Sequence, residues 1–274
     1  MVDLVSIISV LLIFSVVILY RYIRVGKSSL LFFKGDLIEG QNYKKAEFFR
    51  FIQIIIGFIL LLAHSILFFG LKNAVLFFTL CIMISFVVEF LGVKTGVVFG
   101  GYYTYDNEKN GPMFFGVPIL ILITWFGLIY MSFNYSIYIL DLKNLEFYNL
   151  DFYGKFKICI FSSILVAFLD LVLDPIAVDE KRWLWKHPGF YYGVPILNFI
   201  GWFFNCLIIL TIFSYNPFNF IVNPFNSVSN IPVYLFLMIS LIACRPCFER
   251  NLKFPGIFGI FFSVFLIILL IIVL

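Results

Sequence analysis

The chain has 274 residues, of which 63% are apolar and only 12% carry a charge. Soluble domains carry charge on roughly 25% of their residues, so the composition excludes an ordinary soluble enzyme and indicates a polytopic membrane protein. The net charge of +4 does not require a nucleic-acid partner, because basic loops at the inner membrane face interact with anionic lipid headgroups.

Eight apolar runs are long enough to cross a bilayer, at roughly 20 residues per crossing. Little sequence remains between them for a soluble domain. We therefore expect an all-α bundle of about eight transmembrane helices, forming a single membrane domain over residues 1–274. The runs are 4–23, 50–70, 73–92, 116–139, 157–175, 194–215, 231–247 and 256–274.

The positive charges predict the orientation of this bundle. Most of the 19 Lys and Arg residues fall on the first, third, fifth and seventh connections between runs. Connections rich in Lys and Arg stay in the cytoplasm. This pattern predicts a multi-pass protein of the cell membrane with both termini outside. The first run is not preceded by a basic segment or followed by a small-residue cleavage site, so we expect it to remain in the mature protein.

Acidic side chains occur near the ends of the third and fifth runs. Glu89 lies about three residues, or roughly 5 Å, before the third run leaves the hydrocarbon core. Asp170 has the equivalent depth in the fifth run, and Asp174 follows one turn later on the same face. Pro175 predicts that this helix ends at Asp174. Because charged groups inside a membrane are costly and usually functional, we expect the three carboxyl groups to cluster; the alternative is that they only cap helices or pair with nearby basic residues.

A five-residue motif occurs twice in the chain. Gly-Val-Pro-Ile-Leu stands at 116–120 and again at 193–197, and each copy is followed five residues later by a tryptophan. Each copy also comes after an apolar run that carries acids. We predict a parallel internal repeat of two helix hairpins, about 74–139 and 157–215, related by an axis along the membrane normal.

The loops before the two copies are rich in Gly, Tyr and Trp. Irregular backbone at membrane depth persists only where it is buried in protein or lines a cavity. Aromatic side chains there could line a substrate pocket or could only anchor the protein at the interface. The candidate substrate-binding residues are Tyr102, Tyr103, Trp125, Trp183, Trp185, Tyr192 and Trp202.

Other polar side chains within the runs have simpler expected roles. Asn198 could form a hydrogen bond between helices or orient a water molecule, and His64 is more typical of a helix contact than of a proton relay. Cys244 and Cys247 have the CxxC spacing, but a zinc site needs about four ligands and no second pair is present. We therefore expect no metal and, with five cysteines, no disulfide framework.

An ordered set of motifs between residues 80 and 215 resembles the carotenoid biosynthesis protein family of integral membrane proteins. The set comprises Glu-Phe-Leu-Gly at 89–92, Gly-Tyr-Tyr-Thr-Tyr at 101–105, the two Gly-Val-Pro copies with their tryptophans, Asp-Leu-Val-Leu-Asp-Pro at 170–175, and Trp-Leu-Trp at 183–185. The resemblance implies hydration of a terminal C=C bond of a carotenoid or related isoprenoid lipid, without a cofactor. It implies a lipophilic substrate, membrane lipids and other lipid-biosynthesis enzymes as partners.

The residues themselves suggest how such a hydration could proceed. Protonation of a terminal alkene gives a tertiary carbocation, which water then attacks. Two carboxyl groups one turn apart do not both ionise readily, so one can hold a proton. The candidate catalytic residues are Glu89 or Asp170 as proton donor and Asp174 as its partner, with Asn198 or a tyrosine to position the water molecule.

Two other functions fit the same pattern. Small transporters are also built from parallel repeats with polar groups inside the membrane, although their sites lie near the bilayer midplane. The chain could also be a non-catalytic subunit of a lipid-synthesis complex.

Overall fold

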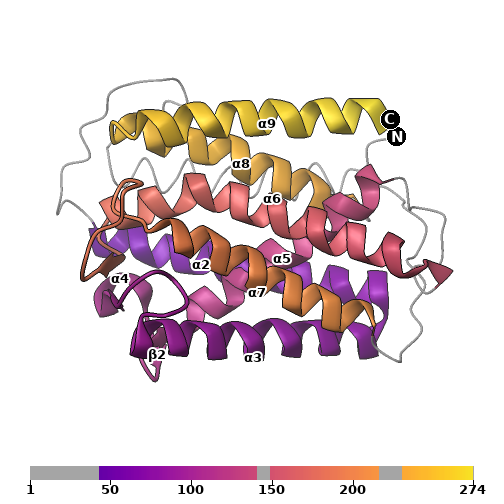
Figure 1. The fold of residues 1–274 in the computed structure, drawn as a ribbon, viewed down its shortest axis with the longest axis horizontal. Coiled ribbons are helices and arrows are strands. Elements are labelled where there is room, and N and C mark those ends of the chain that lie inside the picture. The colour runs from indigo at the N-terminus through magenta and orange to yellow at the C-terminus, as the bar shows by residue number, and fades with distance from the viewer. Residues whose placement is uncertain (1–42, 141–148, 216–229, 274) are drawn as a thin grey trace.

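The computed structural model shows a bundle of long helices that run along one common direction (Figure 1). It describes residues 43–140, 149–215 and 230–273. Within these ranges seven helices are long and apolar enough to cross a membrane. The expected all-α membrane bundle is therefore confirmed, while the run expected at 4–23 lies outside the described residues.

Each of the seven helices coincides with one apolar run, with ends that differ by at most seven residues, because hydropathy and length define a membrane-spanning helix. Gly70, between the first two of them, has φ 79°, a conformation that glycine adopts without steric cost. The helices are α2 (Tyr43–Phe69), α3 (Leu71–Thr95), α5 (Ile119–Ile139), α6 (Phe152–Asp179), α7 (Ile196–Ser214), α8 (Ile231–Glu249) and α9 (Lys253–Val273).

Helix α5 lies at the centre of the bundle. All of its residues from Phe126 to Tyr138 are buried, and it contacts α2, α3, α6 and α8. In contrast, α9 exposes large apolar side chains such as Phe261 and Ile272. Exposed apolar side chains on the outer helices suit a protein whose surface meets lipid tails rather than water.

The expectation that the fifth run ends at Asp174 is wrong. Helix α6 continues through Pro175 to Asp179. Proline lacks the N–H that would bond to the carbonyl of Leu171, four residues earlier. The hydroxyl of Tyr191 instead donates to that carbonyl at 2.9 Å. The acceptor that proline leaves open is thus satisfied from a neighbouring loop, and the helix can continue inside the membrane.

Short irregular elements gather at one end of the bundle, where α3 and α6 end (left in Figure 1). Strand β1 (Tyr103–Tyr105) pairs antiparallel with β4 (Trp183–Trp185), with Thr104 opposite Leu184. This ribbon joins the loop after α3 to the loop after α6. The other elements are α4 (Asn107–Asn110), β2 (Met113–Phe114) and β3 (Val117–Pro118).

The two copies of the five-residue motif have the same local backbone. Phe115 and Gly116 have φ 50° and 87°, and Tyr192 and Gly193 have φ 51° and 86°. Positive φ at both central residues is typical of type I′ hairpin turns. The loops also exchange matching hydrogen bonds, since the Asp106 N–H donates to the carbonyl of residue 182 and the N–H of residue 186 to that of residue 102. These hydrogen bonds only extend the antiparallel β1–β4 ladder, whereas the matching turns are what a duplication would produce; the repeat of 74–139 and 157–215 itself stays a prediction.

Candidate functional site

A cavity of about 90 Å³ lies where α3, α5, α6 and α7 meet the β1–β4 ribbon. Its aromatic wall consists of Phe99, Tyr103, Tyr105, Trp183, Trp185 and Trp202, and the other apolar residues are aliphatic. Its polar lining consists of Glu89, Thr124, Asp174 and Asn198. An apolar chamber with a few convergent polar groups is the usual form of a small-molecule site.

Glu89 is held by three donors. Its Oε2 accepts hydrogen bonds from the hydroxyls of Tyr103 at 2.6 Å and Tyr105 at 2.8 Å. Its Oε1 accepts one from the indole Nε1 of Trp125 at 3.0 Å. Only 3% of Glu89 is exposed. These three hydrogen bonds favour the charged form of the carboxyl group, whereas its burial opposes that form.

Burial raises the pKa of Tyr105 well above its ordinary value, and the negative charge of Glu89 adds to this effect. The pKa of Tyr103 is raised by the same two causes in the same order. Both hydroxyls therefore keep their protons over the physiological range. They remain hydrogen-bond donors to Glu89.

Asp170 and Asp174 have a different environment. The amide Nδ2 of Asn198 donates to Oδ2 of Asp170 at 2.9 Å and to Oδ2 of Asp174 at 2.5 Å. Oδ1 of Asp170 is buried and has no hydrogen-bond partner among the described residues. A buried ionised carboxylate with an unpartnered oxygen would be costly. One amide bridges the two carboxyl groups, and this pair is suited to hold a shared proton.

The structure brings the three acids and Asn198 together. Glu89 and Asp174 line one cavity, while Asp170 lies behind Asp174 and is joined to it through Asn198. The helix-capping alternative does not describe Glu89, whose carboxylate bonds to three aromatic side chains from other elements. The catalytic roles of these four residues stay predictions.

Four of the seven aromatic candidates line the cavity, namely Tyr103, Trp183, Trp185 and Trp202. A fifth, Trp125, lies directly behind it, with its ring centroid 3.7 Å from that of Trp202. Tyr102 and Tyr192 do not line it and are 54% and 38% exposed.

Among the three residues that donate hydrogen bonds to Glu89, sequence reasoning missed Tyr105. Successive side chains of a strand point to opposite faces. Tyr103 and Tyr105 therefore share the face of β1 that contacts Glu89, whereas Tyr102 and Thr104 point away from it. The alternation of 103 and 105, matched by Trp183 and Trp185 on β4, was the signal that could have found it.

Close approach to Glu89 depends on a glycine one turn further along α3. A Cβ at Gly92 would lie 2.7 Å from the Tyr103 hydroxyl and 2.7 Å from the ring of Phe99. Real Cβ atoms do not approach other atoms so closely. Gly92 therefore makes room for the two aromatic residues that close this side of the cavity.

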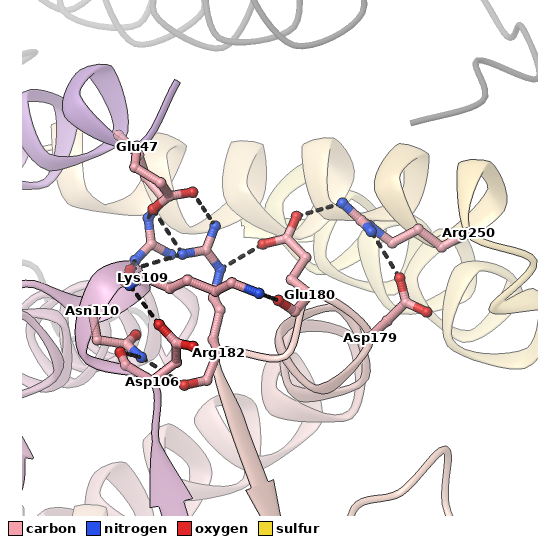
Figure 2. Close-up of polar contacts among 9 residues, drawn as sticks. Glu47, Asp106, Lys109, Asn110, Asp179, Glu180, Arg182 and Arg250 are labelled. Carbon is pink, nitrogen blue, oxygen red and sulfur yellow. Dashed lines mark hydrogen bonds and ion pairs between the residues drawn. The ribbon is translucent and has the colours of Figure 1, made fainter. Parts of the chain in front are cut away.

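A network of ion pairs holds the start of β4 (Figure 2). Arg182 directly precedes this strand, and its side chain is only 3% exposed. Its guanidinium forms two hydrogen bonds with Glu47 of α2, at 2.9 and 2.7 Å, and one with Glu180 at 2.5 Å. Paired bonds of this kind fix orientation as well as supplying energy. The network thereby positions the strand that carries Trp183 and Trp185.

Glu180 is the second centre of this network (Figure 2). Its carboxylate also accepts from Arg250, which in turn bonds to Asp179 at 2.7 Å, and its carbonyl accepts from Nζ of Lys109 at 2.7 Å. Burial acts to raise the pKa of Glu180, but the charges of Arg182 and Arg250 outweigh it and lower that pKa below the ordinary 4.5. The carboxylate is thus ionised at neutral pH and links α6 to α8.

His64 and another buried polar residue, Asn205, make contacts between helices, away from the cavity. Nδ1 of His64 and the hydroxyl of Tyr130 are 2.6 Å apart. Nδ2 of Asn205 donates to Oγ of Ser85 at 3.0 Å. Hydrogen bonds between buried polar side chains join helices that have no hydrophobic force between them in lipid.

Comparison with known proteins agrees with this architecture. The model of the family described as "Carotenoid biosynthesis protein" matches residues 49–271. The chain belongs to the carotenoid biosynthesis protein family. The match includes all the residues of the cavity, and it confirms the resemblance seen in the motifs.

A curated protein with a similar sequence is bisanhydrobacterioruberin hydratase of Haloarcula japonica, which is 32% identical to this chain over 133 residues. The match covers 48% of this chain and 41% of the relative. No solved structure matches the chain. Membership of this family and the similarity to this relative support a carotenoid-modifying role for the protein. Its seven apolar helices are compatible with a multi-pass membrane protein.

Proposed function

We propose that this protein adds water to a terminal C=C bond of a carotenoid or a related long isoprenoid lipid. It would be a carbon–oxygen lyase of the hydratase type and would work without a cofactor. The proposal rests on one observation: Glu89, held by its three donors, and the Asp170–Asp174 pair, bridged by one amide, meet at the same apolar cavity. The name of the relative, a hydratase, supports the same reaction class.

The proton comes from the Asp170–Asp174 pair. Asp174 lines the cavity and Asp170 does not, so only Asp174 can touch the substrate. This geometry favours Asp174 as the donor and Asp170 as its partner, the reverse of the roles expected from the sequence. Transfer of the proton to the less substituted alkene carbon breaks the π bond, forms a C–H bond and leaves a tertiary cation.

The cation needs stabilisation at the opposite wall. Glu89, with its three donors, supplies a fixed negative charge. The faces of Trp183 and Trp202 supply the electron-rich surface that cations favour. A site whose charges are in place before the reaction lowers the barrier without having to reorganise.

Water completes the reaction. Asn198 lines the cavity and donates both of its bonds to the aspartates, which leaves its amide oxygen free to orient a water molecule. The water oxygen forms a C–O bond with the cation, and its surplus proton returns to the aspartate pair. The products are a tertiary alcohol and an enzyme in its starting state.

The test is expression in a host that accumulates lycopene or bisanhydrobacterioruberin, followed by mass analysis of the extracted pigments. We expect the wild-type chain to add the mass of one water, and Asp174→Asn to lose this product. Asn205→Ala serves as the matched control, since Asn205 is a buried amide of α7 that bonds to Ser85 outside the cavity. Full hydration by inserted Asp174→Asn protein would contradict the proposed role of Asp174.

A further inference from the structure

A second hollow, of about 420 Å³, lies between α6 and α7. Several of its residues are exposed on the outside of the bundle, including Phe168 at 41%, Ile196 at 61% and Ile200 at 43%. Its lining is apolar apart from Tyr191, whose hydroxyl already bonds to the carbonyl of Leu171. We call this hollow the α6–α7 groove. It faces the lipid and offers no polar group to bind a headgroup.

The site cavity is too small for a whole isoprenoid lipid. For comparison, an engineered protein cavity of about 150 Å³ binds a molecule no larger than benzene, and the site cavity measures about 90 Å³. It can therefore take only the terminal group of a long chain. Under the proposed function, the rest of the substrate must lie against another surface of the protein.

The α6–α7 groove lies where the rest of the substrate could bind, next to the site cavity. Residues of α6 and α7 line both the groove and the site cavity. The hydrogen bonds from Asn198 to the two aspartates cross between these helices. Leu171 in the groove lies one turn before Asp174 in the cavity, and residues three apart are neighbours on a helix surface. Only one layer of side chains therefore lies between the groove and the acids, and the end group of a chain bound in the groove would enter the cavity by passing between the side chains of this layer.

The lining of the groove also fits a flat, conjugated chain. Five of its ten residues are aromatic, namely Phe168, Phe190, Tyr191, Phe199 and Phe203, whereas aromatic residues make up 21% of the whole chain. Aromatic rings stack favourably on other π systems.

We propose that the α6–α7 groove binds the apolar conjugated chain of the substrate whose terminal double bond reacts in the site cavity. This inference rests on the proposed function for the identity of the ligand. It separates recognition into two subsites, a terminal-group chamber and a polyene groove. Short isoprenoids would then use the first subsite without the second.

The experiment compares two tryptophan substitutions on α7. Ile200→Trp fills the groove, and Ile208→Trp is its matched control, since Ile208 is 45% exposed, lies two turns further along the helix and is not part of the groove. The full chain is placed in nanodiscs with lycopene, or with geranylacetone, a short isoprenoid ending in a similar double bond. We expect Ile200→Trp to raise KM for lycopene ~10-fold, because the bulky indole occupies the space that the chain would fill. The kinetic constants for geranylacetone should be unchanged.

Ala167→Phe fills the same groove from α6 and should give the same pattern, which guards against misfolding of a single variant. Equal losses for both substrates, or equal effects of the Ile200 and Ile208 variants, would overturn the groove assignment. Saturable quenching of tryptophan fluorescence by lycopene measures binding without turnover. If wild type binds lycopene and Ile200→Trp does not, yet neither substrate is hydrated, the proposed function fails and the groove stands.

Discussion

At the scale of single residues, the three buried carboxyl groups have similar intrinsic acidity but different hydrogen-bond partners. Glu89 accepts from two hydroxyls and an indole. Asp170 and Asp174 share one amide, and an oxygen of Asp170 has no partner in the described part of the chain. Hydrogen-bond donors favour the charged form of an acid, and their lack favours the neutral form. This difference supports the proposed division of roles, with Glu89 as a fixed charge and the Asp170–Asp174 pair as the proton holder.

Tyr105→Phe tests the fixed charge. The substitution removes one donor from Glu89 and leaves the ring in the cavity wall, so Tyr103 and Trp125 still hold the carboxylate. A hydrogen bond to a charged group contributes about 1.5–3 kcal/mol, so we expect kcat to fall ~10–100-fold with little change in KM. Tyr102→Phe is the control, because Tyr102 is exposed and outside the cavity. Equal kcat values for wild type and Tyr105→Phe would remove Tyr105 from the mechanism.

At the scale of elements, hydropathy predicted the membrane helices because the bilayer fixes their length. The acids converge as expected because the two loops that follow them are joined by the β1–β4 ribbon. Two features escaped prediction because they depend on partners distant in sequence. The choice of Tyr105 over Tyr102 needed the strand, and the continuation of α6 beyond Pro175 needed the hydroxyl of Tyr191.

A double-mutant cycle measures that second dependence. Tyr191→Phe leaves the Leu171 carbonyl unpaired inside the membrane, and we expect a loss of about 1–3 kcal/mol in the free energy of unfolding. Pro175→Ala restores a backbone N–H to this carbonyl, so Tyr191→Phe should cost less than half as much in the Pro175→Ala background. Denaturant unfolding in detergent gives the four free energies. Additive effects would show that the two residues do not share this acceptor.

At the scale of the whole molecule, the site and the charged network lie at the same end of the bundle, because β4 carries Trp183 and Trp185 of the cavity and directly follows Arg182 of the network. The network of Arg182, Glu180 and Arg250 joins α2, α6 and α8 to β4 (Figure 2). Its basic residues lie on the connections that the charge pattern assigns to the cytoplasm. Sequence could predict the charge of this end but not the pairing, because Glu47 and Arg182 come from connections far apart in the chain.

The network should make stability depend on pH through Glu180. Its pKa is lowered in the folded protein, so the folded state favours the ionised form more than the unfolded chain does. The resulting stabilisation is complete above the unfolded pKa of about 4.3 and is lost as the pH falls through the lower folded value.

We therefore expect Glu180→Gln to lower the free energy of unfolding at pH 7 by about 3 kcal/mol, as for other buried ion pairs that lose one partner. On acidification below about pH 4 the wild type should lose stability and approach the variant. Thermal unfolding in detergent across this pH range measures the difference in stability between the two proteins. Titration of the other acidic residues affects both proteins equally and does not contribute to this difference. Glu108→Gln, at an exposed acid of α4, should follow the wild type throughout. A constant gap between wild type and Glu180→Gln at all pH values would show that the ionised carboxylate of Glu180 does not hold this end of the bundle together.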